Sequence, residues 1–281
     1  MAERGLLLMA YGTPASAADV EAYYTHVRRG RRPTPEQLSD LVRRYEAIGG
    51  ISPLLERTRA QAEGVRHELG DGWRVVLGMK HSRPFIEDGV AELKHAGVER
   101  SVGLVLAPHY SGLSVGEYAE RAAGIDVVES WHLEPGLIDL LADRLGELDT
   151  AGALVLFTAH SLPERILADG DPYPAQLRET AAAVATAAGI DDWQVAWQSA
   201  GRTPEPWIGP DILDVIRTSR RDIVVCACGF VADHLEVLYD LDIEARRVAE
   251  EVGVTFARTR SLNDDPRFLR VLADVVRRRG R

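Results

Sequence analysis

Short apolar segments alternate with amphipathic segments along most of the chain. The apolar runs are residues 6–11 (LLLMAY), 73–79 (WRVVLGM), 102–108 (VGLVLAP), 153–160 (ALVLFTAH), 193–200 (WQVAWQSA) and 223–230 (IVVCACGF). Strands that are apolar along almost their whole length are typical of parallel sheets covered on both faces. The pattern therefore predicts an α/β protein in which helices flank parallel sheets.

A helix is predicted after each of these strands, and one more near the end of the chain. The expected helices are Ala18–Arg29, Pro84–His95, Val115–Ala123, Ala175–Ala188, Pro210–Arg220, Asp233–Glu251 and Asp265–Arg279. The small, polar stretch Gly146–Gly152 indicates a hinge between two such units. We predict two Rossmann-like domains, formed by residues 1–148 together with 262–281 and by residues 149–261, with an active-site cleft between them.

The two predicted domains begin alike. Residues 6–14 read LLLMAYGTP and residues 154–163 read LVLFTAHSLP, so a polar aromatic residue follows each apolar run. Ligands of open parallel sheets bind outside the carboxyl ends of the strands. Tyr11 and His160 are therefore predicted to point into one shared cleft, one from each domain.

Composition and charge narrow the classes of function. The chain has 281 residues, of which 46% are hydrophobic, and its net charge is −10, which disfavours general nucleic-acid binding. No apolar run reaches the roughly 18 residues needed to span a bilayer, and the N-terminal run is too short for a signal peptide. We expect a cytoplasmic monomer that binds neither nucleic acid nor membrane.

Several familiar motifs are absent from the sequence. It contains no G-x-G-x-x-G after the first strand, no G-x-x-x-x-G-K-[ST] and no G-x-S-x-G. The sequence therefore lacks the main motifs that would indicate nucleotide binding or acyl hydrolysis. Cys226 and Cys228 are expected to fill the core as small apolar side chains, and two thiols cannot supply the four ligands of an iron–sulfur cluster.

A basic patch stands out in this acidic chain. Six arginines and only two acidic residues lie between Val27 and Arg44. Arginine suits bidentate recognition of carboxylate or phosphate, although a solvated basic surface is the alternative. The glycine turn Ile48–Pro53 is expected to bring Ser52 near this patch, whereas Tyr118 fits either the core or the rim of a pocket.

Three carboxylates recur at four-residue spacing in the predicted helix 233–251. Glu236, Asp240 and Glu244 would share one helix face, which faces either water or a cation. His160 is either a hydrogen-bonded structural residue or a base or metal ligand, and Glu236 is its natural partner just past another strand. His234 is predicted to point to a different side of the helix.

Specific motifs cover nearly the whole chain. They are MAYGTP (9–14), YYTHVRRGRRP (23–33), RYEAIGGISPL (44–54), PFIEDGVAEL (84–93), LAPHYS (106–111), TAHSLPE (158–164), GDPYPAQL (170–177), WQSAGRTPEPWIGPD (197–211) and GFVADHLEVLYDLDIE (229–244). In these motifs the chain resembles the ferrochelatase family, and most of all the bacterial enzymes of the coproporphyrin-dependent haem pathway. The resemblance implies a chelatase-like fold and insertion of Fe²⁺ into coproporphyrin III, giving Fe-coproporphyrin (coprohaem) and two protons, without a redox cofactor or an iron–sulfur cluster.

The resemblance also implies roles for single residues. His160 and Glu236 would be the catalytic metal-site pair on one face of the macrocycle, and Tyr11 would ligate the product iron on the other. Asp240 and Glu244 would extend the metal site towards solvent. The residues expected to hold the porphyrin, besides Tyr11, are Arg28, Arg44, Tyr45, Ser52 and Tyr118.

Tyr11 and the arginine patch favour coproporphyrin as the substrate. Family members that use protoporphyrin resemble one another in an apolar residue at the position of Tyr11, and the patch suits four propionates better than two. Three alternatives stay open: a protoporphyrin IX ferrochelatase, a chelatase for a precorrin-type tetrapyrrole, and a haem or porphyrin carrier without turnover. Transient contact with neighbouring haem-pathway enzymes is also expected.

Overall fold

Two four-stranded parallel sheets form the framework of the computed structural model, which describes residues 4–201 and 203–280. The first sheet has the order β2-β1-β3-β4, and the second has the order β6-β5-β7-β8. The strands are β1 (Arg4–Ala10), β2 (Trp73–Met79), β3 (Arg100–Val105), β4 (Asp126–Val128), β5 (Leu154–His160), β6 (Trp193–Gln198), β7 (Ile223–Cys226) and β8 (Phe256–Arg258). The matching strand orders show that the two halves share one topology, and the predicted fold class is confirmed.

Helices follow nearly every strand. In the first half they are η1 (Ala17–Asp19), α1 (Val20–Val27), α2 (Pro35–Ala47), α3 (Leu54–Leu69), α4 (Ile86–His95), η2 (Gly112–Gly116), α5 (Glu117–Arg121) and α6 (Pro135–Gly146). In the second half they are α7 (Arg165–Ala168), α8 (Tyr173–Ala188), α9 (Ile212–Thr218), α10 (Leu235–Leu238), η3 (Asp240–Ala245), α11 (Arg246–Val252) and α12 (Pro266–Arg279).

The prediction of one regular helix over residues 233–251 is wrong. The segment contains α10, the π-helical η3 and α11. In η3 the backbone N–H of Glu244 donates to the carbonyl of Tyr239, five residues earlier, at 2.9 Å. This wider turn breaks the four-residue repeat on which the predicted column of carboxylates depended.

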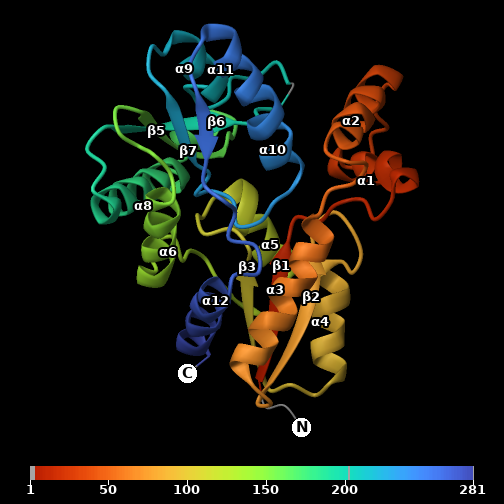
Figure 1. Ribbon diagram of the computed structural model, residues 1–281. Coiled ribbons are helices and arrows are strands. Elements are labelled where there is room, and N and C mark those ends of the chain that lie inside the picture. Colours follow the sequence, from red (N-terminus) through yellow and green to blue (C-terminus); the bar gives the residue numbers. More distant parts are fainter. Residues whose placement is uncertain (1–3, 202, 281) are drawn as a thin grey trace.

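The hydrophobic core runs without a break between the two halves. One buried cluster includes Leu6 and Leu8 of β1, Phe157 of β5 and Phe268 of α12. Figure 1 shows one sheet above the other, with the blue α12 returning beside the first sheet, where it packs on α3 and α6. The core also contains the free thiols of the two cysteines, as predicted, although Cys228 lies just beyond β7. The predicted domain boundaries stay a prediction.

Helices α1 and α2 form an arm, defined here as residues 20–47, that stands above the first sheet and across from α10 of the second half (Figure 1). Helix α2 begins with a capping box, in which the Thr34 hydroxyl accepts from the N–H of Gln37 and the Gln37 side chain accepts from the N–H of Thr34. Pro35 occupies the first helical turn, where its missing N–H costs nothing. The sequence pattern therefore starts α2 sharply and fixes the basic residues at its other end.

None of the helices among the described residues is long and apolar enough to cross a membrane.

Candidate active site

A cavity of about 570 Å³ lies where the carboxyl ends of both sheets meet. Tyr11 follows β1, Lys80 and His81 follow β2, and His160 is the last residue of β5; all four line this cavity. This is the place where open parallel sheets bind ligands. The cavity therefore unites Tyr11 and His160 from opposite halves, as their positions at strand ends predicted.

Two glycines allow close packing of the backbone beside the cavity. Gly12 has φ +89°, and a Cβ atom there would lie 2.4 Å from the Ser82 hydroxyl oxygen. A Cβ on Gly229 would lie 2.3 Å from the Cβ of Ala159. Because only glycine fits at these approaches, the loop that carries Tyr11 and the loop that leads into α10 can pack against neighbouring strand ends.

His160 offers a free imidazole nitrogen to the cavity. Its Nδ1 atom contacts the carbonyl oxygen of Ser161, which can only accept a hydrogen bond, so Nδ1 carries the proton in the neutral ring. Nε2 is then left with its lone pair, 3.6 Å from Oε1 of Glu236. This arrangement suits a base or a metal ligand, with Nδ1 anchoring the ring.

Glu236 lies between two imidazoles. Its second oxygen, Oε2, is 3.6 Å from Nε2 of His234, and His234 lines the cavity. Burial alone would raise the pKa of Glu236, but His160 and His234 outweigh burial and hold that pKa below its usual range. Burial lowers the pKa of His234, but the contact with Glu236 outweighs it and raises that pKa. The prediction that His234 points away from Glu236 is wrong, because His234 lies in extended backbone just before α10 and not within a helix.

Asp240 lies behind Glu236 and not on the cavity surface. Its carboxylate accepts a hydrogen bond from the Ser199 hydroxyl and lies 3.4 Å from Nη1 of Arg44. Burial, with the nearby charge of Glu236, raises the pKa of Asp240 to about 7. Glu244 is a further electrostatic neighbour of Asp240 but does not line the cavity. Asp240 thus has both other acids as electrostatic neighbours. The roles of Asp240 and Glu244 as secondary metal sites stay predictions.

Tyr11 stands on the opposite wall. Its side chain is 44% exposed, and its ring centroid lies 4.6 Å from that of His81. Desolvation in the cavity and the charge of Glu236 raise the pKa of Tyr11, so it is a neutral phenol. Burial lowers the pKa of His81 to about 3, and its Nδ1 lies 3.0 Å from Nδ1 of His26. Tyr11 and His81 are therefore neutral aromatic groups on a wall that also carries the charged side chains of Lys80 and Glu117.

Of the residues predicted to hold a porphyrin, Tyr45, Ser52 and Tyr118 line the cavity, whereas Arg28 and Arg44 do not. The guanidinium of Arg28 lies 5.5 Å from the ring centroid of Tyr24, and Arg29 lines the cavity instead. The binding roles of all five residues stay predictions.

Sequence reasoning missed Lys80, whose ammonium lies 2.5 Å from Oε2 of Glu117 and 5.2 Å from the ring centroid of Tyr118. A usable signal existed, because Lys80 directly follows β2, just as Tyr11 follows β1.

His160 and Glu236 remain a predicted metal-site pair, and no three His, Cys, Asp or Glu residues within the described part of the chain are grouped to hold a metal ion.

Solved structures with a similar fold include the sirohydrochlorin chelatase SirB from Bacillus subtilis subspecies spizizenii, determined in complex with cobalt. It aligns with 99% of this chain and 95% of its own at a TM-score of 0.59 and 9% identity. A structure of SirB from Bacillus subtilis with Fe³⁺ aligns at a TM-score of 0.57 and 11% identity, covering 99% of this chain and 96% of that chain. At such identities the likeness concerns the fold alone.

Sequence comparison is more specific. A family model described as Ferrochelatase matches residues 3–280. The coproporphyrin III ferrochelatase of Anoxybacillus flavithermus (strain DSM 21510 / WK1) is 47% identical, over 97% of this chain and 95% of the relative. That of Geobacillus sp. (strain WCH70) is 45% identical, over 98% of this chain and 97% of the relative. The chain therefore belongs to the ferrochelatase family.

Proposed function

We propose that this protein inserts Fe²⁺ into coproporphyrin III, forming Fe-coproporphyrin and releasing two protons. Membership of the ferrochelatase family implies a porphyrin and iron as substrates. The names of relatives at 45% and 47% identity support coproporphyrin III as the porphyrin. The product is an intermediate of haem biosynthesis.

One observation carries the proposal at the level of the site. A single cavity has Tyr11 on one wall and the pair His160 and Glu236 on the other. A flat macrocycle between these walls would present one face to a phenol and the other to a base and a carboxylate. The arrangement supplies ligands and a proton acceptor where the pyrrole nitrogens exchange protons for iron.

Charged residues of both halves suit a substrate with four carboxylates. Arg29 and Lys80 line the cavity from the first half, and Arg165 lines it from the second. Guanidinium and ammonium groups bind carboxylates through charge-assisted hydrogen bonds. Coproporphyrin, with four propionates, can reach cations on both walls, which supports it over the two-propionate protoporphyrin.

The proposed chemistry is an exchange of two protons for one metal ion. The lone pair on Nε2 of His160 accepts the first pyrrole proton and passes it to the carboxylate of Glu236 at 3.6 Å. The same nitrogen then accepts the second pyrrole proton, and both protons leave to solvent. The freed nitrogens bind Fe²⁺, which enters as a substrate and keeps its oxidation state. Because no electron is transferred, we propose that the enzyme uses no redox cofactor and no iron–sulfur cluster. We also propose that the protein is a monomer and that it makes transient contacts with neighbouring haem-pathway enzymes.

A side-by-side insertion assay tests the proposed substrate. Purified enzyme would receive Fe²⁺ without oxygen, with either coproporphyrin III or protoporphyrin IX, and metal insertion would be followed by absorbance. We expect a higher kcat/KM with coproporphyrin III. Equal or better use of protoporphyrin IX would contradict the proposal.

The variant His160→Ala tests the role of His160 in iron insertion. Loss of a general base typically costs 10²–10⁴-fold in rate, so we expect iron insertion to fall by about that much. Porphyrin binding, measured by fluorescence quenching, should change by less than about threefold, because the propionate contacts lie elsewhere. A wild-type protein that binds porphyrin but never inserts metal would instead be a carrier.

A further inference from the structure

Tyr239 connects the arm to the segment that carries Glu236. It lies between α10 and η3, and only 5% of its surface is exposed. Its hydroxyl accepts a hydrogen bond from Nη1 of Arg43 at 2.9 Å. The guanidinium carbons of Arg43 and Arg44 lie 5.9 and 4.8 Å from its ring centroid. The buried ring of Tyr239 therefore contacts two guanidinium groups from the opposite half.

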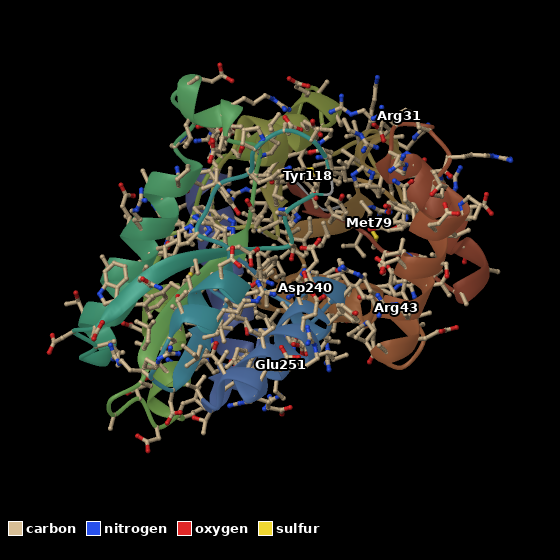
Figure 2. The ribbon with its side chains drawn as sticks, turned by 90° about the horizontal axis from the view of Figure 1, so that it is seen from above. Arg31, Arg43, Met79, Tyr118, Asp240 and Glu251 are labelled. Atoms are coloured by element: carbon tan, nitrogen blue, oxygen red, sulfur yellow. The ribbon has the colours of Figure 1, made fainter. Side chains whose placement is uncertain are left out.

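The same two arginines are held by acidic residues of both halves. Asp40 of the arm lies 2.6 Å from Nη2 of Arg43 and 3.2 Å from Nε of Arg44, and Asp240 lies 3.4 Å from Nη1 of Arg44. Figure 2 labels Arg43 on the arm and Asp240 on the second half, where the two parts face each other. Arg44 is thus fixed by a ring and two carboxylates, so its position depends on both halves.

Helix α2, by contrast, packs mainly on α1 within the arm. The side chain that follows Arg44 is Tyr45, which lines the cavity, and Glu236 lies three residues before Tyr239. A link between Arg44 and Tyr239 therefore sets the spacing between the wall expected to hold porphyrin and the wall that carries Glu236.

We propose that Tyr239 is a positioning residue, which orients Arg43 and Arg44 and so holds the arm at the distance from Glu236 that a bound porphyrin requires. This inference rests on the proposed function, in which the porphyrin binds in the cavity that Tyr45 lines. A cation over a desolvated aromatic ring and a hydrogen bond from a charged donor are both stronger than their exposed counterparts. Tyr239 acts through the arginines and does not touch the reacting atoms.

The test compares binding with catalysis in Tyr239→Leu, which removes both the ring and the hydroxyl. We expect the Kd for coproporphyrin III, measured by fluorescence quenching without metal, and the KM to rise about tenfold, because the arm loses its anchor. The kcat with saturating porphyrin should stay within about twofold, because His160 and Glu236 are untouched. A structural lesion at the site would lower kcat as well.

Milder variants keep the test decisive if Tyr239→Leu folds poorly. Tyr239→Phe and Arg43→Gln each remove one end of the same hydrogen bond. Tyr239→Phe keeps the buried ring, and the Arg43 side chain is 61% exposed, so neither variant should disturb the core. We expect each to raise the Kd by about threefold and the double variant by no more than either single one. Arg247→Gln, which breaks an exposed ion pair with Glu251 on α11, is the matched control and should leave the Kd unchanged.

Two outcomes would overturn the role of Tyr239. One is a folded Tyr239→Leu enzyme with the wild-type Kd, and the other is a double variant whose effect is the sum of the two single effects. These outcomes differ from failure of the proposed function, which would show in the wild type as poor insertion of iron into coproporphyrin III.

Discussion

The Nε2 atom of His160 lies 3.6 Å from Oε1 of Glu236, although the two residues belong to different segments of the second half. His160 ends β5, whereas Glu236 lies in α10, the helix that follows β7. Strands β5 and β7 are hydrogen-bonded neighbours, so the sheet brings the two segments together. The pair is therefore in place before any substrate binds, as pre-organised catalytic groups should be.

His234 is expected to matter for catalysis, because it lies as close to Glu236 as His160 does. His234→Ala removes one of the two imidazoles beside the carboxylate. Residues that orient a metal ligand typically contribute 10–100-fold, so kcat should fall roughly tenfold. Steady-state kinetics with Fe²⁺ and coproporphyrin III would measure this, with porphyrin binding measured in parallel.

The conservative variant His234→Asn is the control for this prediction. An asparagine amide can donate a hydrogen bond towards Glu236, so part of the lost activity should return. Unchanged kcat in His234→Ala would show that Glu236 needs only His160.

Gly229→Ala should destabilise the fold. The added methyl group would meet the Cβ of Ala159 at 2.3 Å and its Cα at 2.7 Å, so backbone must move. Overpacking of this kind typically costs about 1–3 kcal/mol, and chemical denaturation would measure it. In Gly72→Ala, the matched control, the new methyl group meets nothing within 4 Å, so a stability loss as large as that of Gly229→Ala would refute the steric explanation.

The sequence allowed the two sheets and the cavity to be predicted because both follow from local patterns. Apolar runs such as LLLM of β1 are buried completely, and the polar residue after each run lies at the sheet edge where ligands bind. Tyr11 and His160 could be placed in this way. The short edge strands β4 and β8 have only three residues each, too few to show a pattern.

Other parts of the site depend on backbone geometry and tertiary contacts. The π-helical turn η3 interrupts the α-helix, so the spacing of Glu236, Asp240 and Glu244 suggested a regular helical repeat that the backbone does not follow. The direction of the His234 side chain was predicted wrongly because His234 lies in extended backbone before α10 and not within a helix. The contact of Arg44 with Tyr239 joins segments far apart in the chain, and no local pattern predicts it.

Arg165→Gln should weaken the binding of coproporphyrin III more than that of protoporphyrin IX. Arg165 is a cation on the cavity wall of the second half, where additional propionates would lie. Its ion pair with Glu205, at 2.6 Å, joins side chains that are 57% and 37% exposed, so it contributes little to stability. We expect the KM for coproporphyrin III to rise about fivefold and that for protoporphyrin IX to change by less than about twofold.

Glu205→Gln is the matched control, because it breaks the same ion pair and leaves the cation in place. Its KM for coproporphyrin III should not rise. Equal increases in KM for both porphyrins in Arg165→Gln would show that Arg165 does not discriminate between them.

Glu147 should make stability depend on pH in the acid range. Hydrogen bonds from Arg260, and further from Arg144, lower the pKa of Glu147 to about 2. Because its pKa in the unfolded chain is higher, about 4.3, the ionised side chain stabilises the fold above that value, and this contribution is lost as the pH falls towards 2. Glu147→Gln should therefore be less stable than the wild type at pH 7, and the difference should shrink steadily between pH 5 and 3. Urea denaturation of both proteins across this range measures it, and a difference that does not change with pH would show that Glu147 acts through packing and not through its charge.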